Sequence, residues 1–162
     1  MMDKGLSLRE TEAFIEGNGH LTDLVKFGFG TSYVTPNLKE KIKLYKENGI
    51  TPYFGGTLFE AFYARGKFED YLRVLDQYGM EMAEVSDGSI IIDHDHKCEA
   101  IRRLAKDRTV LSEVGSKDAG ILIAPNRWIK MMKTELQAGS WKVIAEGREA
   151  GNVGVFRANG QA

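Results

Sequence analysis

Two short segments decide the fold: Met82–Ser86 (MAEVS) and Thr109–Val114 (TVLSEV), which begin 27 residues apart. We interpret both as short β-strands. Between them, Ile101, Leu104 and Ala105 recur at the spacing of one helical face. A strand, a helix and a second strand in so few residues form the repeating unit of parallel α/β proteins.

The same alternation continues along the chain in both directions. Further β-rich runs occupy Leu24–Phe29, Ile50–Phe54 and Lys142–Glu146, so successive runs begin 26, 32, 27 and 33 residues apart. A stub before Asp3 supplies a first strand. Predicted helical faces between the runs include Leu38, Ile42 and Tyr45, and later Ile129, Met132 and Leu136.

We therefore predict an α/β protein, a (β/α)8 TIM barrel of which about six βα units are present, in a single partial domain over residues 1–162. A doubly wound sheet would also alternate strands and helices. Its dinucleotide-binding version requires GxGxxG in the first βα turn, whereas Gly28–Ser32 reads GFGTS and lacks the third glycine.

Composition limits the possible partners. The 162 residues carry a net charge of −1, which offers no broad field for nucleic acid or an anionic membrane. No apolar run has the length of a signal-peptide core or a membrane span. The single cysteine, Cys98, excludes an intrachain disulfide. We expect a cytoplasmic protein that acts on small molecules and binds neither nucleic acid nor a membrane.

Charged residues interrupt strands that should be apolar when both faces are buried. They are Lys26, Glu84, Glu113 and Glu146, each near the C-terminal end of its run. In a barrel these ends meet at one mouth, where the active site lies. We predict that three carboxylates and a lysine converge there; the alternative is a structural network of ion pairs without chemistry.

Oxygen ligands from Glu84, Glu113 and Glu146 suit a hard divalent cation, and Mg²⁺ usually takes one or two carboxylates together with substrate oxygens. The sequence leaves open which glutamates bind it. The run Asp93–His96 (DHDH) is interpreted as a solvated segment that caps a helix, and the histidines form no transition-metal motif.

Residues in the loops after the strands are candidates for substrate binding. Gly55, Gly56 and Thr57 place backbone N–H groups at the start of a helix, an arrangement that binds anions. Ser86 and Asp87 follow another strand. Two cations beyond strand ends suit a phosphorylated or carboxylated substrate: Lys117 and Arg148.

Six strings at strand ends, taken together, resemble the phosphosulfolactate synthase family. The resemblance runs from Asp3 to about Phe156, in matching order and spacing. The strings are DKGLSL from Asp3, DLVKFGFGTS from Asp23, GGTLFE from Gly55, EVSDGS from Glu84, VLSEVGSKD from Val110 and VIAEGREAG from Val143.

This resemblance implies a Mg²⁺-dependent lyase on a (β/α)8 barrel that adds sulfite to phosphoenolpyruvate and gives (2R)-phospho-3-sulfolactate, the start of coenzyme M synthesis in archaea. It implies Lys117 as the acid that protonates the carbon bearing the phosphate. Lys26 and Glu113 complete the implied catalytic set, and Lys4 and Arg148 are implied to bind the anionic substrate.

Barrels typically reach about 250 residues. We expect the chain to be a fragment of a longer product, to close through another copy as a homo-oligomer, or to be an inactive remnant. Two alternatives to the synthase therefore stay open. One is a non-catalytic or stress-associated relative, and the other is a different enolate-forming barrel lyase that acts on a phosphorylated acid.

Overall fold

The computed structural model describes residues 1–116 and 123–147. The contacts of the chain fall into two compact units, Met1–Ala83 and Glu84–Ala162. No helix of the described ranges combines the length and the hydrophobicity that a bilayer crossing requires.

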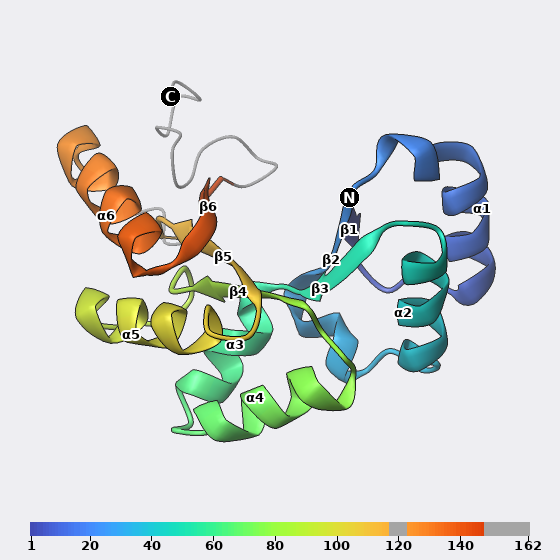
Figure 1. Cartoon of the computed structure of the whole chain (residues 1–162), viewed down its shortest axis with the longest axis horizontal. Coiled ribbons are helices and arrows are strands. Elements are labelled where there is room, and N and C mark those ends of the chain that lie inside the picture. Colours follow the sequence, from blue (N-terminus) through green and yellow to red (C-terminus); the bar gives the residue numbers. More distant parts are fainter. Residues whose placement is uncertain (117–122, 148–162) are drawn as a thin grey trace. The chain divides into compact units, whose positions relative to one another are not determined.

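Strands and helices alternate as the spacing predicts (Figure 1). In the first unit the elements are β1 (Met2–Asp3), α1 (Leu8–Asn18), η1 (Gly19–Leu21), β2 (Leu24–Phe27), η2 (Gly28–Tyr33), α2 (Leu38–Glu47), β3 (Thr51–Phe54), α3 (Gly56–Tyr63), α4 (Phe68–Gln77) and the start of β4 (Met82–Ser86). The rest of β4 and the following elements belong to the second unit: α5 (His94–Leu104), β5 (Thr109–Val114), α6 (Pro125–Ala138) and β6 (Ser140–Ala145).

The six strands form one sheet in the order β1-β2-β3-β4-β5-β6, and every pairing for which a register is known is parallel. A doubly wound sheet reverses its strand order at a switch point. A sheet that follows chain order throughout is the arrangement of consecutive barrel strands. The predicted fold class, a parallel α/β fold with part of a TIM barrel, is therefore confirmed.

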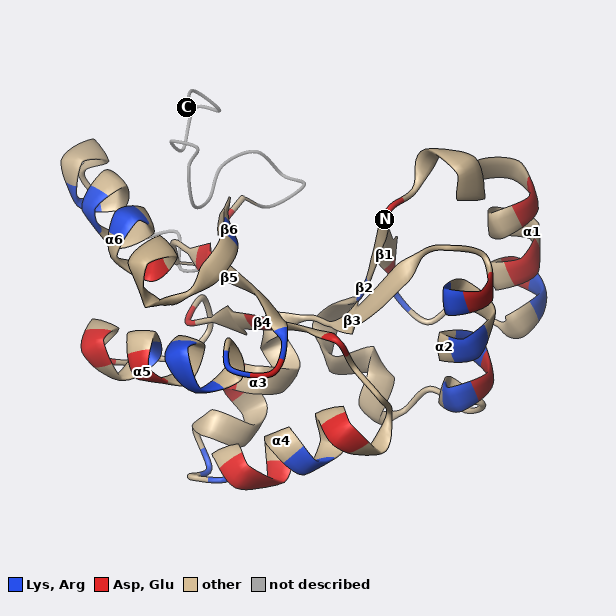
Figure 2. Ribbon diagram, in the orientation of Figure 1, with Lys and Arg blue, Asp and Glu red and all other residues tan. Residues whose placement is uncertain are grey.

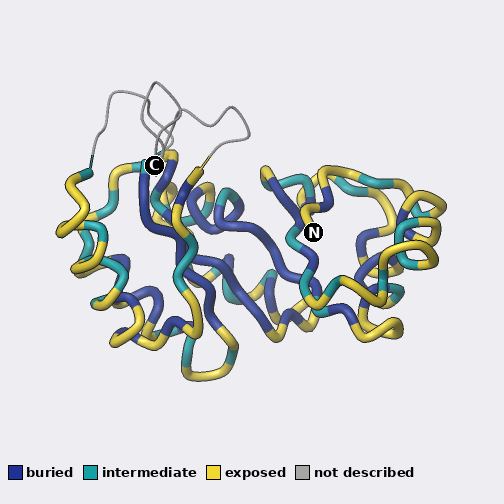
Figure 3. Tube along the Cα trace, turned by 90° about the horizontal axis from the view of Figure 1, so that it is seen from above, coloured by how far each residue is buried: buried dark blue, intermediate teal, exposed yellow. Residues whose placement is uncertain are grey.

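Helix α2 covers one face of β2 in the first unit. Val25 and Phe27 are fully buried, and the Phe27 ring meets the Tyr45 ring of α2 edge-on at 6.1 Å between centroids. Leu38 and Ile42, also on α2, are buried as the helical spacing predicts. Figure 3 shows helical turns that are buried on one side and exposed on the other.

Strand β2 ends earlier than predicted. The residue pattern predicts a strand that reaches Phe29, but the strand stops at Phe27 and a 3-10 segment begins at Gly28. Phe29 and Gly30 both have left-handed backbone angles, with φ of 54° and 68°. A strand requires negative φ, so this turn ends the strand.

In the second unit, α5 buries Ile101 and Leu104, as the helical spacing predicts, and it also buries Cys98. The predicted face of α6 is wrong, because Ile129 and Leu136 are exposed. The fully enclosed side chain of α6 is instead Glu135, a charged residue that hydrophobic periodicity ignores.

Candidate functional site

Lys26 lies on β2 between the buried residues Val25 and Phe27, so its side chain leaves the sheet on the face opposite to the one that packs on α2. Its register partner on β3 is Tyr53. The Lys26 side chain then passes over Gly55, where a Cβ atom would lie only 2.9 Å from Lys26 Cε. Glycine at position 55 leaves the space that this lysine occupies.

The predicted anion-binding turn Gly55–Thr57 begins α3. Gly55 is the N-cap residue, and no side chain caps this helix end. The Gly55 N–H donates to Phe27 O at 3.0 Å, so it is already used to join the ends of β2 and β3. Gly56 is buried, and Thr57 lines a cavity of about 530 Å³ together with Phe29 and Arg65.

Asp3 and Lys4, at the end of β1, have different surroundings. Lys4 lies over the Phe29 ring, 5.5 Å from its centroid, and lines a second cavity of about 610 Å³ that Arg9 also lines. Asp3 is fully buried, and its Oδ2 lies 2.7 Å from Lys41 Nζ and accepts a hydrogen bond from the Tyr45 hydroxyl at 3.0 Å.

The surroundings of Asp3 favour its charged form. Burial acts to raise its pKa, but the hydrogen bond from Lys41 and those from the backbone N–H groups of Gly5 and Leu6 outweigh burial, so the pKa is lowered. Burial and the nearby Asp3 charge raise the pKa of Tyr45. Asp3 is therefore an ionised structural carboxylate at neutral pH.

The three predicted metal ligands all belong to the second unit. Glu84, Glu113 and Glu146 are each at most 6% exposed, although they are carboxylates at strand ends. Glu113 pairs in register with Ile144, and the Glu146 N–H donates to Val114 O at 2.8 Å. Glu113 therefore lies on β5, and Glu146 directly follows the adjacent strand β6, two residues beyond the register partner of Glu113.

Gly115 directly follows β5 and closely approaches Glu146. Its φ is 125°, and a Cβ atom at this position would lie 2.7 Å from Glu146 Cβ and 2.6 Å from Cη2 of Trp128 on α6. Only glycine combines that backbone angle with so close an approach. The position thus sets how the chain leaves β5.

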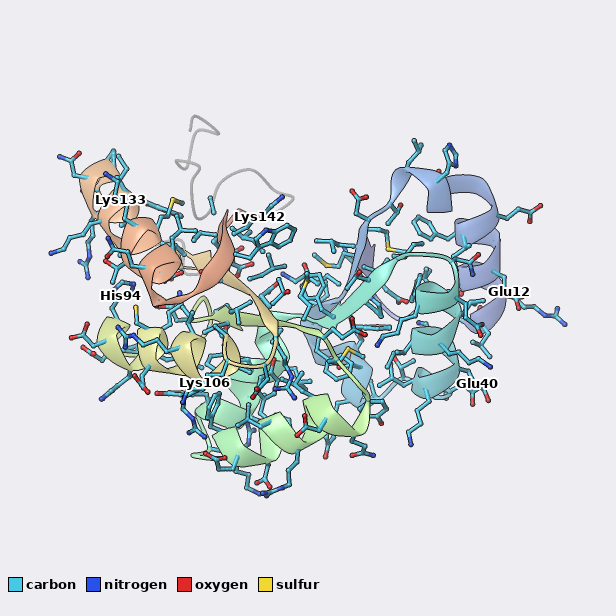
Figure 4. All side chains as sticks on the ribbon, viewed as in Figure 1. Glu12, Glu40, His94, Lys106, Lys133 and Lys142 are labelled. Carbon is cyan, nitrogen blue, oxygen red and sulfur yellow. The ribbon has the colours of Figure 1, made fainter. Side chains whose placement is uncertain are left out.

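Asp87, predicted to bind substrate, forms an ion pair with a lysine that the sequence analysis does not single out. Lys97 on α5 is fully buried, and its Nζ lies 2.8 Å from Asp87 Oδ1 and 2.9 Å from Glu135 Oε1. The same Nζ donates to the backbone carbonyl of Glu113 at 2.6 Å. His94 Nε2 lies 3.3 Å from Glu135 Oε1, at the start of α5 and beside α6 (Figure 4).

A signal for Lys97 is present in the sequence. It precedes Ile101 by four residues and Leu104 by seven, so it belongs to the buried stripe of α5. A lysine in an apolar stripe indicates a buried cation with partners. The run DHDH is a cap as predicted, since the Asp93 side chain accepts from the N–H groups of Asp95 and His96; His94, however, is not merely solvated.

Figure 2 shows charged residues of both signs along α1, α2, α4 and α5, whereas the candidate site uses buried charges. Among residues 1–116 and 123–147, no three His, Cys, Asp or Glu side chains form a cluster that would hold a metal by themselves. Magnesium needs no such cage, because one or two carboxylates and substrate oxygens suffice. The buried carboxylates Glu84, Glu113 and Glu146 fit that donor chemistry, and the magnesium site stays a prediction.

Two predicted site residues, Lys117 and Arg148, lie outside the described residues. Ser86, at the end of β4, is fully buried. The structure thus places Lys26 with Gly55 in the first unit, and Asp87, Glu113 and Glu146 around the strand ends of the second. The predicted convergence of Lys26 with the glutamates stays a prediction.

Comparisons with known proteins agree on one family. Residues 1–162 match a family model described as (2R)-phospho-3-sulfolactate synthase (ComA). The chain is 42% identical to the phosphosulfolactate synthase of Methanocaldococcus jannaschii, 37% to that of Bacillus subtilis and 33% to that of Methanothermobacter thermautotrophicus. Each match covers 99% of this chain and 64 to 66% of the relative, so the chain spans just under two thirds of the relatives' length.

Proposed function

Because this chain belongs to the (2R)-phospho-3-sulfolactate synthase family, we propose that it carries strand-end residues of an enzyme that adds sulfite to phosphoenolpyruvate. The names of three relatives support the reaction. The observation that carries the proposal is the burial of Glu84, Glu113 and Glu146 at strand ends, where a barrel enzyme has its active site.

The reaction determines what the site must do. The sulfur lone pair of sulfite attacks the methylene carbon of phosphoenolpyruvate and forms a C–S bond. The π electrons move toward the carboxylate and give an enolate-like dianion, and a proton then adds to the carbon that bears the phosphate. The product is a phosphorylated sulfolactate. The enzyme therefore has to stabilise added negative charge and supply one proton.

Each role is assigned to a residue that the sequence singles out. Lys26 would bind the anionic substrate, because its side chain is held over Gly55 on the sheet face away from α2. Lys4 would add a cation at the end of β1, beside the 610 Å³ cavity. We propose Lys117 as the proton donor and Arg148 as a further anion-binding residue.

We propose that Glu113 and Glu146, with Glu84, hold Mg²⁺ near the substrate. When bound, this ion would neutralise charge that accumulates on the substrate carboxylate. The glutamates are hard oxygen donors, and Glu146 directly follows β6, the strand that pairs with the strand of Glu113. Burial in a site of low dielectric makes such charge stabilisation stronger than in water. The near-neutral chain and its single buried thiol also agree with a cytoplasmic enzyme of small molecules.

One experiment tests the reaction directly. Phosphoenolpyruvate, sulfite and Mg²⁺ are mixed with this chain, and separately with a version that is extended to the full length of the relatives. Loss of phosphoenolpyruvate is followed with and without sulfite. Sulfite-dependent turnover by the extended protein is expected, and its absence would refute the synthase. Lys117→Ala should abolish turnover and leave substrate binding measurable, while removal of Mg²⁺ by a chelator should stop the reaction.

A further inference from the structure

One buried ammonium group connects four structural elements of the second unit. Lys97 Nζ, on α5, lies within 2.9 Å of three oxygens: Asp87 Oδ1 in the segment after β4, Glu113 O on β5 and Glu135 Oε1 on α6. We propose that Lys97 is a positioning residue that sets the C-terminal ends of β4 and β5 for the reaction. This inference rests on the proposed function for its catalytic part.

The contact with Glu113 is the most informative of the three. Lys97 binds the backbone carbonyl of Glu113, and the next carbonyl, that of Val114, accepts the N–H of Glu146 from the β6 side. The last two backbone carbonyls of β5 therefore both accept hydrogen bonds from outside the strand. Because a side chain's direction follows from its backbone, fixing this peptide fixes where the Glu113 carboxylate points.

The contact with Asp87 extends the same control to β4. Asp87 directly follows Ser86, the last residue of β4, and its side chain is 16% exposed while Lys97 is fully buried. A charge-assisted hydrogen bond of 2.8 Å to a buried partner is among the strong ones. Asp87 therefore anchors the segment that follows β4, and the substrate-binding role predicted for it from the sequence stays a prediction.

Two carboxylates face this one ammonium. Glu135 is fully buried, and its Oε1 is shared by Lys97 and by His94. Removing Lys97 would leave Glu135 buried without its nearest cation, which is strongly destabilising. A test based on Lys97 alone would therefore confuse loss of folding with loss of positioning.

The test uses a compensated pair of substitutions. Lys97→Met removes the ammonium, and Lys97→Met with Glu135→Leu also removes the carboxylate that it would strand. The double variant should fold, because a well-packed apolar pair often replaces a buried ion pair without loss of stability. Ile101→Ala, on the same helix and equally buried, is the matched control for general destabilisation of α5.

The first readout does not depend on activity. Hydrogen exchange is measured on peptides that contain Asp87 and on peptides that span Glu113–Ser116. In the double variant both sets should exchange at least about tenfold faster than in the unchanged protein, while Ile101→Ala should leave them slow at equal stability. Unchanged exchange at both strand ends in a folded double variant would overturn the anchoring role.

The second readout is kinetic and uses the extended protein. We expect kcat to fall about tenfold to a hundredfold in the double variant, because misplacement of a charge-stabilising group acts in the transition state. KM should change by less than about threefold. Kinetics equal to those of Ile101→Ala would overturn the catalytic part. If the unchanged extended protein shows no sulfite-dependent turnover, the proposed function and this catalytic part fail together, and the exchange result still decides the anchoring.

Discussion

The Lys26 side chain fills the space above Gly55, so that a Cβ atom there would meet Lys26 Cε at 2.9 Å and Phe27 O at 3.0 Å. Lys26 lies on β2, and Gly55 directly follows the neighbouring parallel strand β3 and is the N-cap residue of α3. Glycine is therefore needed at position 55 to leave room for Lys26 on β2. The backbone angle does not require glycine, since Gly55 has an extended conformation with φ of −67°.

Gly55→Ala should therefore displace Lys26 more than it destabilises the fold. Of the two crowded neighbours, the lysine terminus can move and the Phe27 carbonyl cannot move without the strand. We expect a loss of about 1–2 kcal/mol in the free energy of unfolding, measured by urea denaturation. In the extended protein, kcat/KM for phosphoenolpyruvate should fall about tenfold or more, because the cation is misplaced.

Gly17→Ala is the matched control for Gly55→Ala. Gly17 lies in α1, and a Cβ atom there would have no neighbour within 4 Å. Because alanine favours helix over glycine, the substitution should stabilise the protein by about 0.5–1 kcal/mol and leave kinetics unchanged. Equal kinetic losses in the two variants would contradict the role of Gly55.

The Asp3–Lys41 pair predicts how stability changes with acid. The pKa of Asp3 is lowered in the folded protein, so its contribution to stability is fully present above the unfolded value of about 3.9 and is lost as pH falls through the folded value. Urea denaturation between about pH 6 and pH 2.5 should show stability that falls below about pH 4.5.

Asp3→Asn isolates this contribution from those of other carboxylates. The variant should be less stable by about 3–5 kcal/mol at pH 7, because the buried Lys41 keeps its hydrogen bond to Leu6 O but loses its carboxylate partner. Its stability should depend less steeply on pH in the acid range than that of the unchanged protein. Parallel pH curves for the two proteins would show that Asp3 does not titrate with folding.

Gly115→Ala should be among the most destabilising changes at a loop position. The residue has a φ of 125°, and a Cβ atom would lie 2.6 Å from Trp128 Cη2 and 2.7 Å from Glu146 Cβ. Strain and overpacking each cost about 1–3 kcal/mol. Thermal unfolding should therefore show a clear loss, together with movement of Trp128 that its fluorescence reports. A melting temperature within about 2 °C of the unchanged protein would contradict the crowded geometry.

Periodicity predicts most of the fold because burial repeats regularly in it. The strands Met82–Ser86 and Thr109–Val114 have the predicted bounds. The left-handed turn at Phe29 escapes this reasoning, since nothing in its residue type requires positive φ. Glu135 escapes it because hydrophobic spacing gives no weight to a buried charge, whereas Lys97, its partner in the ion pair, falls at the spacing of the buried stripe of α5.

The charged residues at the strand ends can be predicted because each of them breaks an apolar pattern. A glutamate in an apolar strand is conspicuous, and Glu84, Glu113 and Glu146 are indeed buried. Their ligand roles are not predictable in the same way, because a metal site depends on distances across strands. Spacing along one chain gives no such distance, so the choice among the three glutamates needs a direct measurement.

Substitution of single glutamates tests which of them bind Mg²⁺. Glu113 lies on β5 and Glu146 directly follows the adjacent strand β6. We therefore expect Glu113→Gln and Glu146→Gln each to weaken Mg²⁺ binding about tenfold to a hundredfold by titration calorimetry on the extended protein. Amides keep the shape but lose the charge that a hard cation prefers. Glu99→Gln, an exposed residue of α5 that pairs with Arg102, should leave binding unchanged. Magnesium affinity that is equal in all three variants would remove both glutamates from the metal site and leave Glu84 as the remaining candidate among them.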